Sequence, residues 1–413
     1  MDLERRYTDY VSLGAPGEPL LNGATWNAFC DALRDAGEVV LAEHAPASPL
    51  DRAEGFRYLT RLLQAALVMY VEFADPLHPE IGRPMDTSIK WGLDNVDALY
   101  SSASIRGTET YRIRGEGGSA HYIGLYANFG SFGDKVPEGA WAPGGSSSSI
   151  SNIDALTIDP EGSFEIIVSP EPHDGNWLRT DERVSYVGVR QFFYDWERER
   201  PWHLTIERAG DNGPPPPLSA ETMDRRLRNA IKFVNPGCHF WDWLSRVWWQ
   251  FPPNQIVMAE RGRAITDERQ HYGWGRFLLE EDQALVVSFT PPPDVHYWSF
   301  QLYNWWGESW DYTNRQCSLN GHQAVLDGDG VFRTVLSHAD PGVANWLDPA
   351  GHREGILAPR FLGSESAPAP ACTLVPFSDL KAVLPAETRV VTPEQRSDEL
   401  RRRRDAVWRR FRD

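Results

Sequence analysis

The sequence predicts a mainly β protein with α-helices: a helical N-terminal segment followed by two tandem, related, jelly-roll-like β-sandwich units that a helical connector joins. Three observations predict this class. Apolar residues follow helical spacing before residue 109, short β-like runs separated by Gly, Pro and Ser follow, and such runs return after a proline-rich stretch. The chain has 413 residues, and single cores stop growing at roughly 250 to 300 residues, so more than one domain is expected.

These changes of pattern divide the chain into five parts. Two helices are expected in the first part, one over 25–42 and one that opens at Asp51, with Glu54 at capping-box spacing. In the connector, Asn235-Pro236-Gly237 predicts that one helix ends and a second begins. The five parts are the helical segment 1–108, the first β-sandwich unit 109–213, the proline linker and helical connector 214–275, the second β-sandwich unit 276–392 and a basic amphipathic helix 393–413.

The two β-rich parts repeat one another. Four short matches occur in the same order, at offsets of 168 to 175 residues, and one of them shares an Asn-Trp-Leu. Because Trp is a rare residue, this ordered set indicates duplication of one β-unit. The pairs are His121-Tyr122 with His296-Tyr297, Gly162-Ser163-Phe164 with Gly330-Val331-Phe332, Asn176-Trp177-Leu178 with Asn345-Trp346-Leu347, and, more loosely, Arg190 and Phe192 with Arg360 and Phe361.

The composition bounds the partners. A formal net charge of −17 argues against nucleic acid, because phosphate binding needs a concentrated basic face. The N-terminus has no signal-peptide pattern, and the four cysteines lie far apart, as is typical of reduced thiols. The longest apolar run, 62–73, is far shorter than the ~20 residues of a membrane span. We expect a cytoplasmic protein with a small-molecule substrate, no nucleic-acid partner, no integral membrane contact and the option of a homo-oligomer.

The C-terminal stretch is basic and amphipathic. Leu400, Val407, Trp408 and Phe411 follow helical spacing among many arginines. Such a helix is expected to dock on its own subunit or on a neighbouring acidic one. Binding to an anionic membrane is the alternative.

Four motifs in the second β-rich part carry a resemblance to a known family. They are His296-Tyr297-Trp298-Ser299-Phe300-Gln301-Leu302-Tyr303, Asp340-Pro341-Gly342, Asn345-Trp346-Leu347-Asp348 and Gly351-His352-Arg353-Glu354-Gly355. The segment 296–362 resembles the domain of unknown function 1214 family, which also occurs behind a second domain of unknown function, 1254. The N-terminal half resembles that companion only loosely. The resemblance implies a jelly-roll-like β architecture and supplies no established reaction.

The first candidate site is the aromatic stretch 303–312. Glu308 and Asp311 lie three residues apart and could converge as acid and base if this loop turns helically. Aromatic side chains around them would stack on the ring of a substrate, or would instead cap the sandwich while the carboxylates cap backbone donors. The predicted stacking residues are Tyr303, Trp305, Trp306 and Trp310.

Two further candidates come from the first half of the chain. Asp97, beside Tyr100, could enter a ligand cleft as a catalytic carboxylate, although turns and caps explain the polar residues near it equally well. Strand alternation would place Arg190, Phe192 and Tyr194 on one face, where an arginine beside aromatic rings can bind a carboxylate or sulfate. The alternative for Arg190 is an ion pair with Asp195 or Glu197.

No cofactor or metal is predicted. His352-Arg353-Glu354 has the form of a ligand pair, but no third and fourth ligands follow at diagnostic spacing. Phosphate-binding loops, nucleophile elbows and dinucleotide fingerprints are missing from the sequence.

The sequence favours a cofactor-independent enzyme, a hydrolase or lyase, acting on a sugar-containing or flat apolar small molecule in an aromatic-lined cleft between the β units. The alternative is a non-catalytic protein that binds a carbohydrate or lipid-like ligand. A third possibility is a metal-dependent enzyme of cupin-like type.

Overall fold

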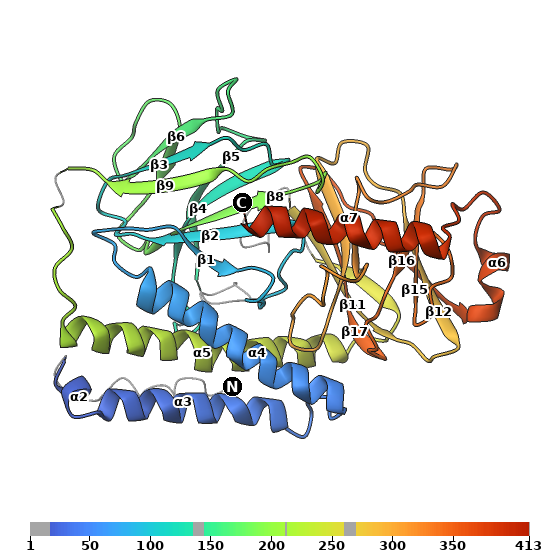
Figure 1. Ribbon diagram of the computed structural model, residues 1–413, viewed down its shortest axis with the longest axis horizontal. Coiled ribbons are helices and arrows are strands. Elements are labelled where there is room, and N and C mark those ends of the chain that lie inside the picture. The colour runs from blue at the N-terminus through green and yellow to red at the C-terminus, as the bar shows by residue number, and fades with distance from the viewer. Residues whose placement is uncertain (1–16, 135–143, 211–212, 260–269, 413) are drawn as a thin grey trace. The chain divides into compact units, whose positions relative to one another are not determined.

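A computed structural model describes residues 17–134, 144–210, 213–259 and 270–412 (Figure 1). The chain forms two compact units. Unit 1 comprises Met1–Lys90, Leu99–Phe192 and Arg200–Trp243, and unit 2 comprises Trp91–Ala98, Phe193–Glu199 and Leu244–Asp413. The predicted class, mainly β with N-terminal helices and a helical connector, is confirmed. Within the described ranges, no helix combines the length and the apolar character needed to cross a bilayer.

Unit 1 begins with a layer of helices. Ser48, rather than Asp51, caps the second long helix, because its side chain accepts a hydrogen bond from the Asp51 amide and Pro49 opens the first turn. Asn235 donates to the carbonyl of Ala32 at 3.2 Å and thereby ties two helices of the layer together. The helices are α2 (Glu18–Leu21), α3 (Ala24–Leu41), α4 (Pro49–Leu67), the π-helix η1 (Val68–Glu72) and α5 (Ala220–Trp249), of which residues up to Trp243 belong to unit 1.

The predicted break in the connector is wrong. α5 runs through Asn235-Pro236-Gly237 as one helix of 30 residues. Residues 233–238 are all buried, so packing of this stretch outweighs the hydrogen bond that Pro236 cannot donate. Sequence propensity alone does not reveal that tertiary contribution.

The remainder of unit 1 is a sandwich of two sheets. Strand order is β1-β2-β8-β4-β5 in the first sheet and β7-β6-β3-β9 in the second. Two of these strands, β1 and β2, come from the segment 1–108 that was predicted as helical. The strands are β1 (Gly82–Met85), β2 (Ala98–Ser104), β3 (Tyr111–Glu116), β4 (Tyr122–Phe129), β5 (Gly145–Ser151), β6 (Phe164–Ser169), β7 (Trp177–Arg179), β8 (Tyr186–Phe192) and β9 (His203–Arg208).

Unit 2 is a second sandwich. Its sheets have the orders β10-β11-β17-β13-β14 and β16-β15-β12-β18, and Trp298 of one sheet packs on Phe289 and Phe332 of the other at 5.2 and 4.9 Å between ring centroids. Its elements are β10 (Gln255–Met258), β11 (Gln270–Leu278), β12 (Gln283–Phe289), β13 (Tyr297–Tyr303), β14 (Ser318–Asn320), β15 (Phe332–Ser337), β16 (Trp346–Leu347), β17 (Glu354–Leu362), β18 (Ala371–Pro376), the 3-10 helix η2 (Phe377–Asp379), α6 (Leu380–Val383) and α7 (Pro393–Arg412).

The two sandwiches have the same topology. Adding nine to each strand number of unit 1 reproduces both strand orders of unit 2, including the parallel pairs β6–β7 and β15–β16. The repeated asparagine makes the same bonds in both units: Asn176 donates to the carbonyls of Thr157 and Glu165, and Asn345 donates to those of Val325 and Arg333. The structure therefore agrees with duplication of one β-unit.

Strand register refines the loosest of the four sequence matches. Tyr122 lies opposite Phe192 and Gly124 opposite Arg190 in unit 1, whereas Tyr297 lies opposite Leu362 and Ser299 opposite Arg360 in unit 2. Arg190 and Arg360 are thus equivalent. The partner of Phe192 is Leu362, and Phe361 was the wrong choice because a shift of one residue places a side chain on the opposite face.

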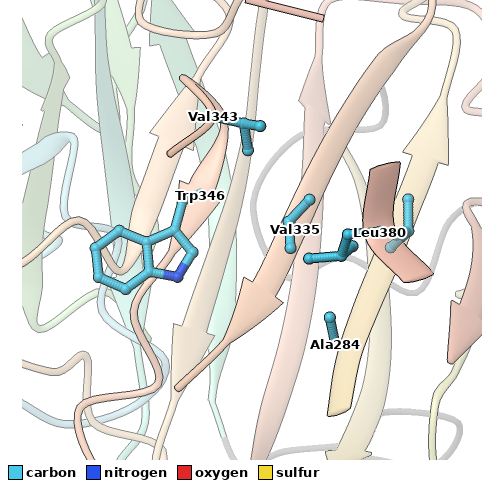
Figure 2. Packing of buried hydrophobic residues seen from close by; sticks show 6 residues of the cluster. Ala284, Val335, Val343, Trp346 and Leu380 are labelled. Atoms are coloured by element: carbon cyan, nitrogen blue, oxygen red, sulfur yellow. The ribbon is translucent and has the colours of Figure 1, made fainter. Parts of the chain in front are cut away.

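A second apolar cluster covers the outer side of the sheet that contains β12 and β15 (Figure 2). Trp346 lies at its edge and donates its indole N–H to the carbonyl of Ser337 at 2.9 Å. Leu380 of α6 covers it, so the short helix after β18 has a packing role. The members are Ala284, Val286, Val335, Val343, Trp346 and Leu380.

The C-terminal helix α7 docks on unit 2 through arginines. Arg396, Arg403 and Arg410 recur every seven residues, which places them on one face, and each is less than a tenth exposed. The guanidinium of Arg403 lies 4.3 Å from the ring centroid of Trp196, and that of Arg410 lies 4.4 Å from it. Trp408, expected to face inward, is 44% exposed. The arginine face therefore makes the contact, because a guanidinium is weakly hydrated and stacks on aromatic rings.

We predict that Arg403→Ala lowers the free energy of unfolding of unit 2 by about 2 to 4 kcal/mol, because the buried Tyr312 carbonyl and Ser318 hydroxyl lose their donor. Arg401→Ala, on the same helix but 65% exposed, should change it by less than about 0.5 kcal/mol. Denaturant titration followed by tryptophan fluorescence measures both. Equal effects would show that α7 does not dock through its arginine face.

Candidate functional site

The predicted site residues divide between the two units. Unit 1 holds Tyr100 and Arg190. The other eight belong to unit 2, so the chemistry of each group has to be examined within its own unit. Those eight are Asp97, Tyr194, Tyr303, Trp305, Trp306, Glu308, Trp310 and Asp311.

In unit 2, the segment Trp91–Ala98 is held by side chains from the sheet that contains β13 and β17. Arg360 donates to the Leu93 carbonyl at 2.5 Å, and Gln301 donates to the Asp94 carbonyl at 2.8 Å. The hydroxyl of Tyr303 donates to the Leu93 carbonyl at 3.2 Å. This residue, which was predicted to stack on a substrate ring, therefore holds the backbone of the segment. The polar face of the sheet thus binds a piece of the protein's own chain.

Asp97 lies near the C-terminal end of this segment, and its exposed fraction is 1%. One carboxylate oxygen accepts from the indole of Trp196 at 2.7 Å and from Asn320 at 2.9 Å, and the other accepts from the hydroxyl of Tyr297 at 2.6 Å. Burial raises the pKa of Asp97 above its usual range, although these hydrogen bonds and the positive charge of Arg410 oppose the rise. Burial also lowers the pKa of Arg410 to about 10.

Glu308 and Asp311 lie in different environments. Glu308 is fully buried, and its side chain accepts from Asn304 at 3.1 Å within the turn 304–308. Asp311 is exposed and caps the next turn through Asn314. No helical turn spans residues 308–311, so the condition for their convergence as an acid and base pair is not met.

The predicted aromatic wall is packed inside unit 2. Trp305, Trp306 and Trp310 are each no more than 5% exposed. Trp305 contacts Trp249 edge to face at 4.5 Å, and Trp310 stacks on His352 at 4.5 Å. These contacts are those of a core, and the side chains offer no exposed ring to a ligand.

Tyr194 does not lie on the same strand as Arg190, because β8 ends at Phe192. The strand stops at Phe192, so the predicted alternation does not extend to Tyr194, which lies in unit 2 with its ring 5.7 Å from that of Tyr297. Burial, with the charge of Asp97, raises the pKa of Tyr194. Asp195 and Glu197, the alternative ion-pair partners of Arg190, form ion pairs within unit 2. Asp195 pairs with Arg198 and His322, and Glu197 pairs with Arg402.

In unit 1, the structure brings together Tyr100 and Arg190, which belong to two separate candidates of the sequence. The guanidinium of Arg190 lies 5.9 Å from the ring centroid of Tyr100 and 5.3 Å from that of Tyr126. The hydroxyls of Tyr122 and Tyr126 are 2.6 Å apart. Arg190 and Tyr100 are half-buried, unlike Trp305, Trp306 and Trp310 of unit 2. We call this group, together with Tyr70 and Tyr186, the tyrosine–arginine cluster.

Gly124 makes room for the paired hydroxyls. A Cβ at this position would lie 2.3 Å from the Tyr122 hydroxyl and 2.8 Å from the Tyr126 hydroxyl. Tyr122 and Tyr126 are four residues apart on one face of β4, and their side chains lean toward each other over this glycine. Because Gly124 is directly opposite Arg190 in the sheet, the hydroxyl pair and the guanidinium occupy one patch.

A π-helix carries Tyr70, the member of the cluster that lies near Tyr186. In η1 the amide of Phe73 bonds to the carbonyl of Val68 at 3.0 Å, which is the i to i+5 pattern, and this turn presents Tyr70. π-helical turns are frequent at functional sites. Burial raises the pKa of Tyr70, to which Tyr186 contributes, and burial likewise raises the pKa of Tyr186 against the positive charge of Arg190.

Sequence reasoning missed four members of the cluster. Strand alternation from Tyr122 would have placed Tyr126 on the same face. The strand register that places Tyr122 and Tyr126 beside Arg190 has no clear sequence signal. The π-helix that carries Tyr70 has none either.

In the part of the chain that the structure describes, no group of three or more His, Cys, Asp or Glu side chains is placed to hold a metal ion. His352 instead contacts the Pro349 carbonyl at 3.0 Å through Nδ1 and stacks on Trp310. The absence of a metal cofactor stays a prediction.

The sequence and fold were compared with known proteins. A family model described as "Protein of unknown function (DUF1214)" matches residues 276–366. The chain belongs to the DUF1214 family. Its matched region runs from β11 to just beyond β17 and includes the side chains that hold the segment Trp91–Ala98. No curated protein matches this DUF1214 chain.

Two solved structures resemble this DUF1214 protein. The crystal structure of an uncharacterized protein from Burkholderia cenocepacia is 34% identical, has a TM-score of 0.82, and the match covers 88% of this chain and 99% of that one. The VPA0106 protein from Vibrio parahaemolyticus is 12% identical, with a TM-score of 0.42, and the match covers 84% of this chain and 100% of that one. The companion domain expected for the N-terminal half stays a prediction.

We predict that Asp97 makes the stability of unit 2 depend on pH. Since its folded pKa is raised, its contribution is most favourable below the unfolded value of about 3.9 and declines as pH rises through the folded pKa. Asp97→Asn should remove that part of the dependence. The measurement is the free energy of unfolding of both proteins from pH 3 upward. Parallel profiles would contradict the assignment.

Proposed function

We propose that unit 1 binds a small molecule that carries an anionic group and a flat or sugar ring, with Arg190 as the anion-binding residue. Tyr100, which is half-buried, would flank the ring. A planar guanidinium with fixed donors suits a carboxylate or sulfate, and phenol rings offer stacking faces beside it.

The comparison of equivalent arginines is the observation that carries this proposal. Arg360 in unit 2 is 4% exposed, and its guanidinium donates to the Leu93 carbonyl and to Gln301 at 3.3 Å. Arg190 holds the same register position on the same face but is half-buried. The arginine of unit 2 is enclosed, whereas Arg190 stays partly open to solvent, and we infer that a ligand reaches Arg190.

Catalysis is the second candidate, and the hydroxyl pair of Tyr122 and Tyr126 favours it. The positive charge of Arg190 can stabilise a phenolate, which could take a proton from the carbon next to a bound carboxylate. Such chemistry favours a lyase over a hydrolase, because the carboxylates predicted as acid and base, Glu308 and Asp311, make structural hydrogen bonds.

The binding proposal predicts that benzoate and glucuronate bind to the protein, whereas benzyl alcohol and glucose, which lack the charge, bind at least about tenfold more weakly. Arg190→Gln should remove that preference. Isothermal titration measures each affinity.

Arg183→Gln is the matched control, because Arg183 also stacks on a ring of unit 1, that of Phe129 at 4.6 Å, but is exposed and paired with Asp181. It should bind the acids as the wild type does. Equal affinity of Arg190→Gln and wild type for both acids would refute the proposal.

The catalytic candidate predicts that the protein exchanges the methylene protons of phenylacetate with solvent deuterium, and that Tyr126→Phe stops this exchange. Proton NMR follows the loss of the methylene signal. Tyr272→Phe, which removes a phenol that stacks in unit 2, is the control. Exchange that survives both Tyr126→Phe and Tyr122→Phe would exclude the hydroxyl pair as the base.

A further inference from the structure

Asn128 of unit 1 lies on the face of the sheet that carries Arg190. Asn128 on β4 is opposite Tyr186 on β8, and Gly188 and Arg190 follow Tyr186 on the same face of that strand. Each of these four residues is partly exposed, whereas the two residues between them on β8 are buried. Solvent therefore reaches this row of residues, and so can a ligand.

A hydrogen bond orients the amide of Asn128. The hydroxyl of Ser146 donates to Asn128 Oδ1. Asn128 is opposite Ser146 and Ala127 is opposite Ser148, so β5 carries one extra residue at this point. Such bulges re-aim side chains, often next to functional sites. In the part of the chain that the structure describes, Asn128 Nδ2 has no hydrogen-bond partner, so its N–H groups are left for a group outside the protein.

The amide nitrogen lies over Gly188. A Cβ on this glycine would come within 2.7 Å of Asn128 Nδ2, and the next nearest atoms would be 3.9 Å from it. Gly188 and Arg190 are adjacent positions on one face of β8. The glycine thus leaves space in which a neutral donor lies beside a cationic one.

The equivalent pair of residues in unit 2 binds a single oxygen atom. By register, Asn128 corresponds to Tyr303. Arg190 corresponds to Arg360 in the same way. Tyr303 and Arg360 both donate to the carbonyl oxygen of Leu93, at 3.2 and 2.5 Å. In the fold that the two units share, donors at these two positions therefore converge on one acceptor group.

We propose that Asn128 Nδ2 binds a second oxygen of the ligand whose anionic group Arg190 holds, so that unit 1 takes 2-hydroxy or 2-oxo carboxylic acids. A neutral amide donor suits a hydroxyl or keto oxygen, and a guanidinium suits the carboxylate. In these acids that oxygen is on the carbon next to the carboxylate, as donors from adjacent positions require. This inference rests on the proposed binding of an acid by Arg190 and adds the class of the acid.

Isothermal titration of the wild type with four compounds tests the class. Mandelate, with a 2-hydroxyl group, and benzoylformate, with a 2-oxo group, should each bind roughly fivefold more tightly than phenylacetate, which has neither. Phenylacetate should bind more tightly than 2-phenylethanol, which lacks the charge. If no acid binds more tightly than this alcohol, the proposed function itself fails. If phenylacetate does and the two oxygenated acids gain nothing over it, only the assignment of Asn128 fails.

Two variants assign the preference to the amide. Asn128→Ala should remove the preference for the oxygenated acids and retain that for phenylacetate over 2-phenylethanol. Gly188→Ala keeps the amide but displaces it, so it should have the same effect, and it decides the question if Asn128→Ala does not fold. Asn229→Ala, which removes an exposed amide of α5 in unit 1, is the matched control and should bind all four compounds as the wild type does. A preference that survives Asn128→Ala and Gly188→Ala would overturn the proposal.

Discussion

An arginine near tyrosine rings recurs at the same register position in both units, and in unit 2 it holds a segment of the chain in place. The guanidinium of Arg360 lies 5.9 Å from the ring centroid of Tyr272 and 5.5 Å from that of Tyr303, and it donates to the carbonyl of Leu93. A buried guanidinium must find oxygen acceptors, and in unit 2 the backbone of Trp91–Ala98 provides them. Gln301 and Tyr303 bind the same stretch of backbone, so the arginine is part of a built surface for a chain segment.

In unit 1 the equivalent arginine, Arg190, is present, but the residues around it differ from those around Arg360. Gln301 and Tyr303, which bind backbone in unit 2, correspond by register to Tyr126 and Asn128. The amide of Gln301 thus corresponds to the ring of Tyr126, and the phenol of Tyr303 corresponds to the amide of Asn128. This exchange agrees with a face that meets a ring-bearing small molecule in place of a protein segment.

The repeated strands could be predicted from the sequence because strand patterns are local and an Asn-Trp-Leu match marks equivalent positions. The bonds of Asn176 and Asn345, to carbonyls 11 to 20 residues away, could not be predicted in this way. The fate of α7 could not be predicted in the same way. In a sequence, arginines indicate a surface position. The face with Arg403 and Arg410 is buried because Trp196, which is distant in sequence, packs against it.

The candidate site was predicted only in part, because local patterns are visible in a sequence and burial is not. Arg190 and Tyr100 were found because strand alternation and residue chemistry are legible in one sequence. The stretch around Glu308 was misleading, since tryptophans of a core and tryptophans of a binding wall have the same spacing. Burial, which separates Trp306 from Tyr100, is a property of the folded chain alone.

The central claim is that the two equivalent arginines have different tasks, and hydrogen exchange measured by mass spectrometry tests it most directly. Lysine lacks the planar fork of arginine, so Arg360→Lys should speed amide exchange in residues 93–98, whereas Arg190→Lys should leave that segment unchanged. Faster exchange in both variants, or in neither, would contradict the account.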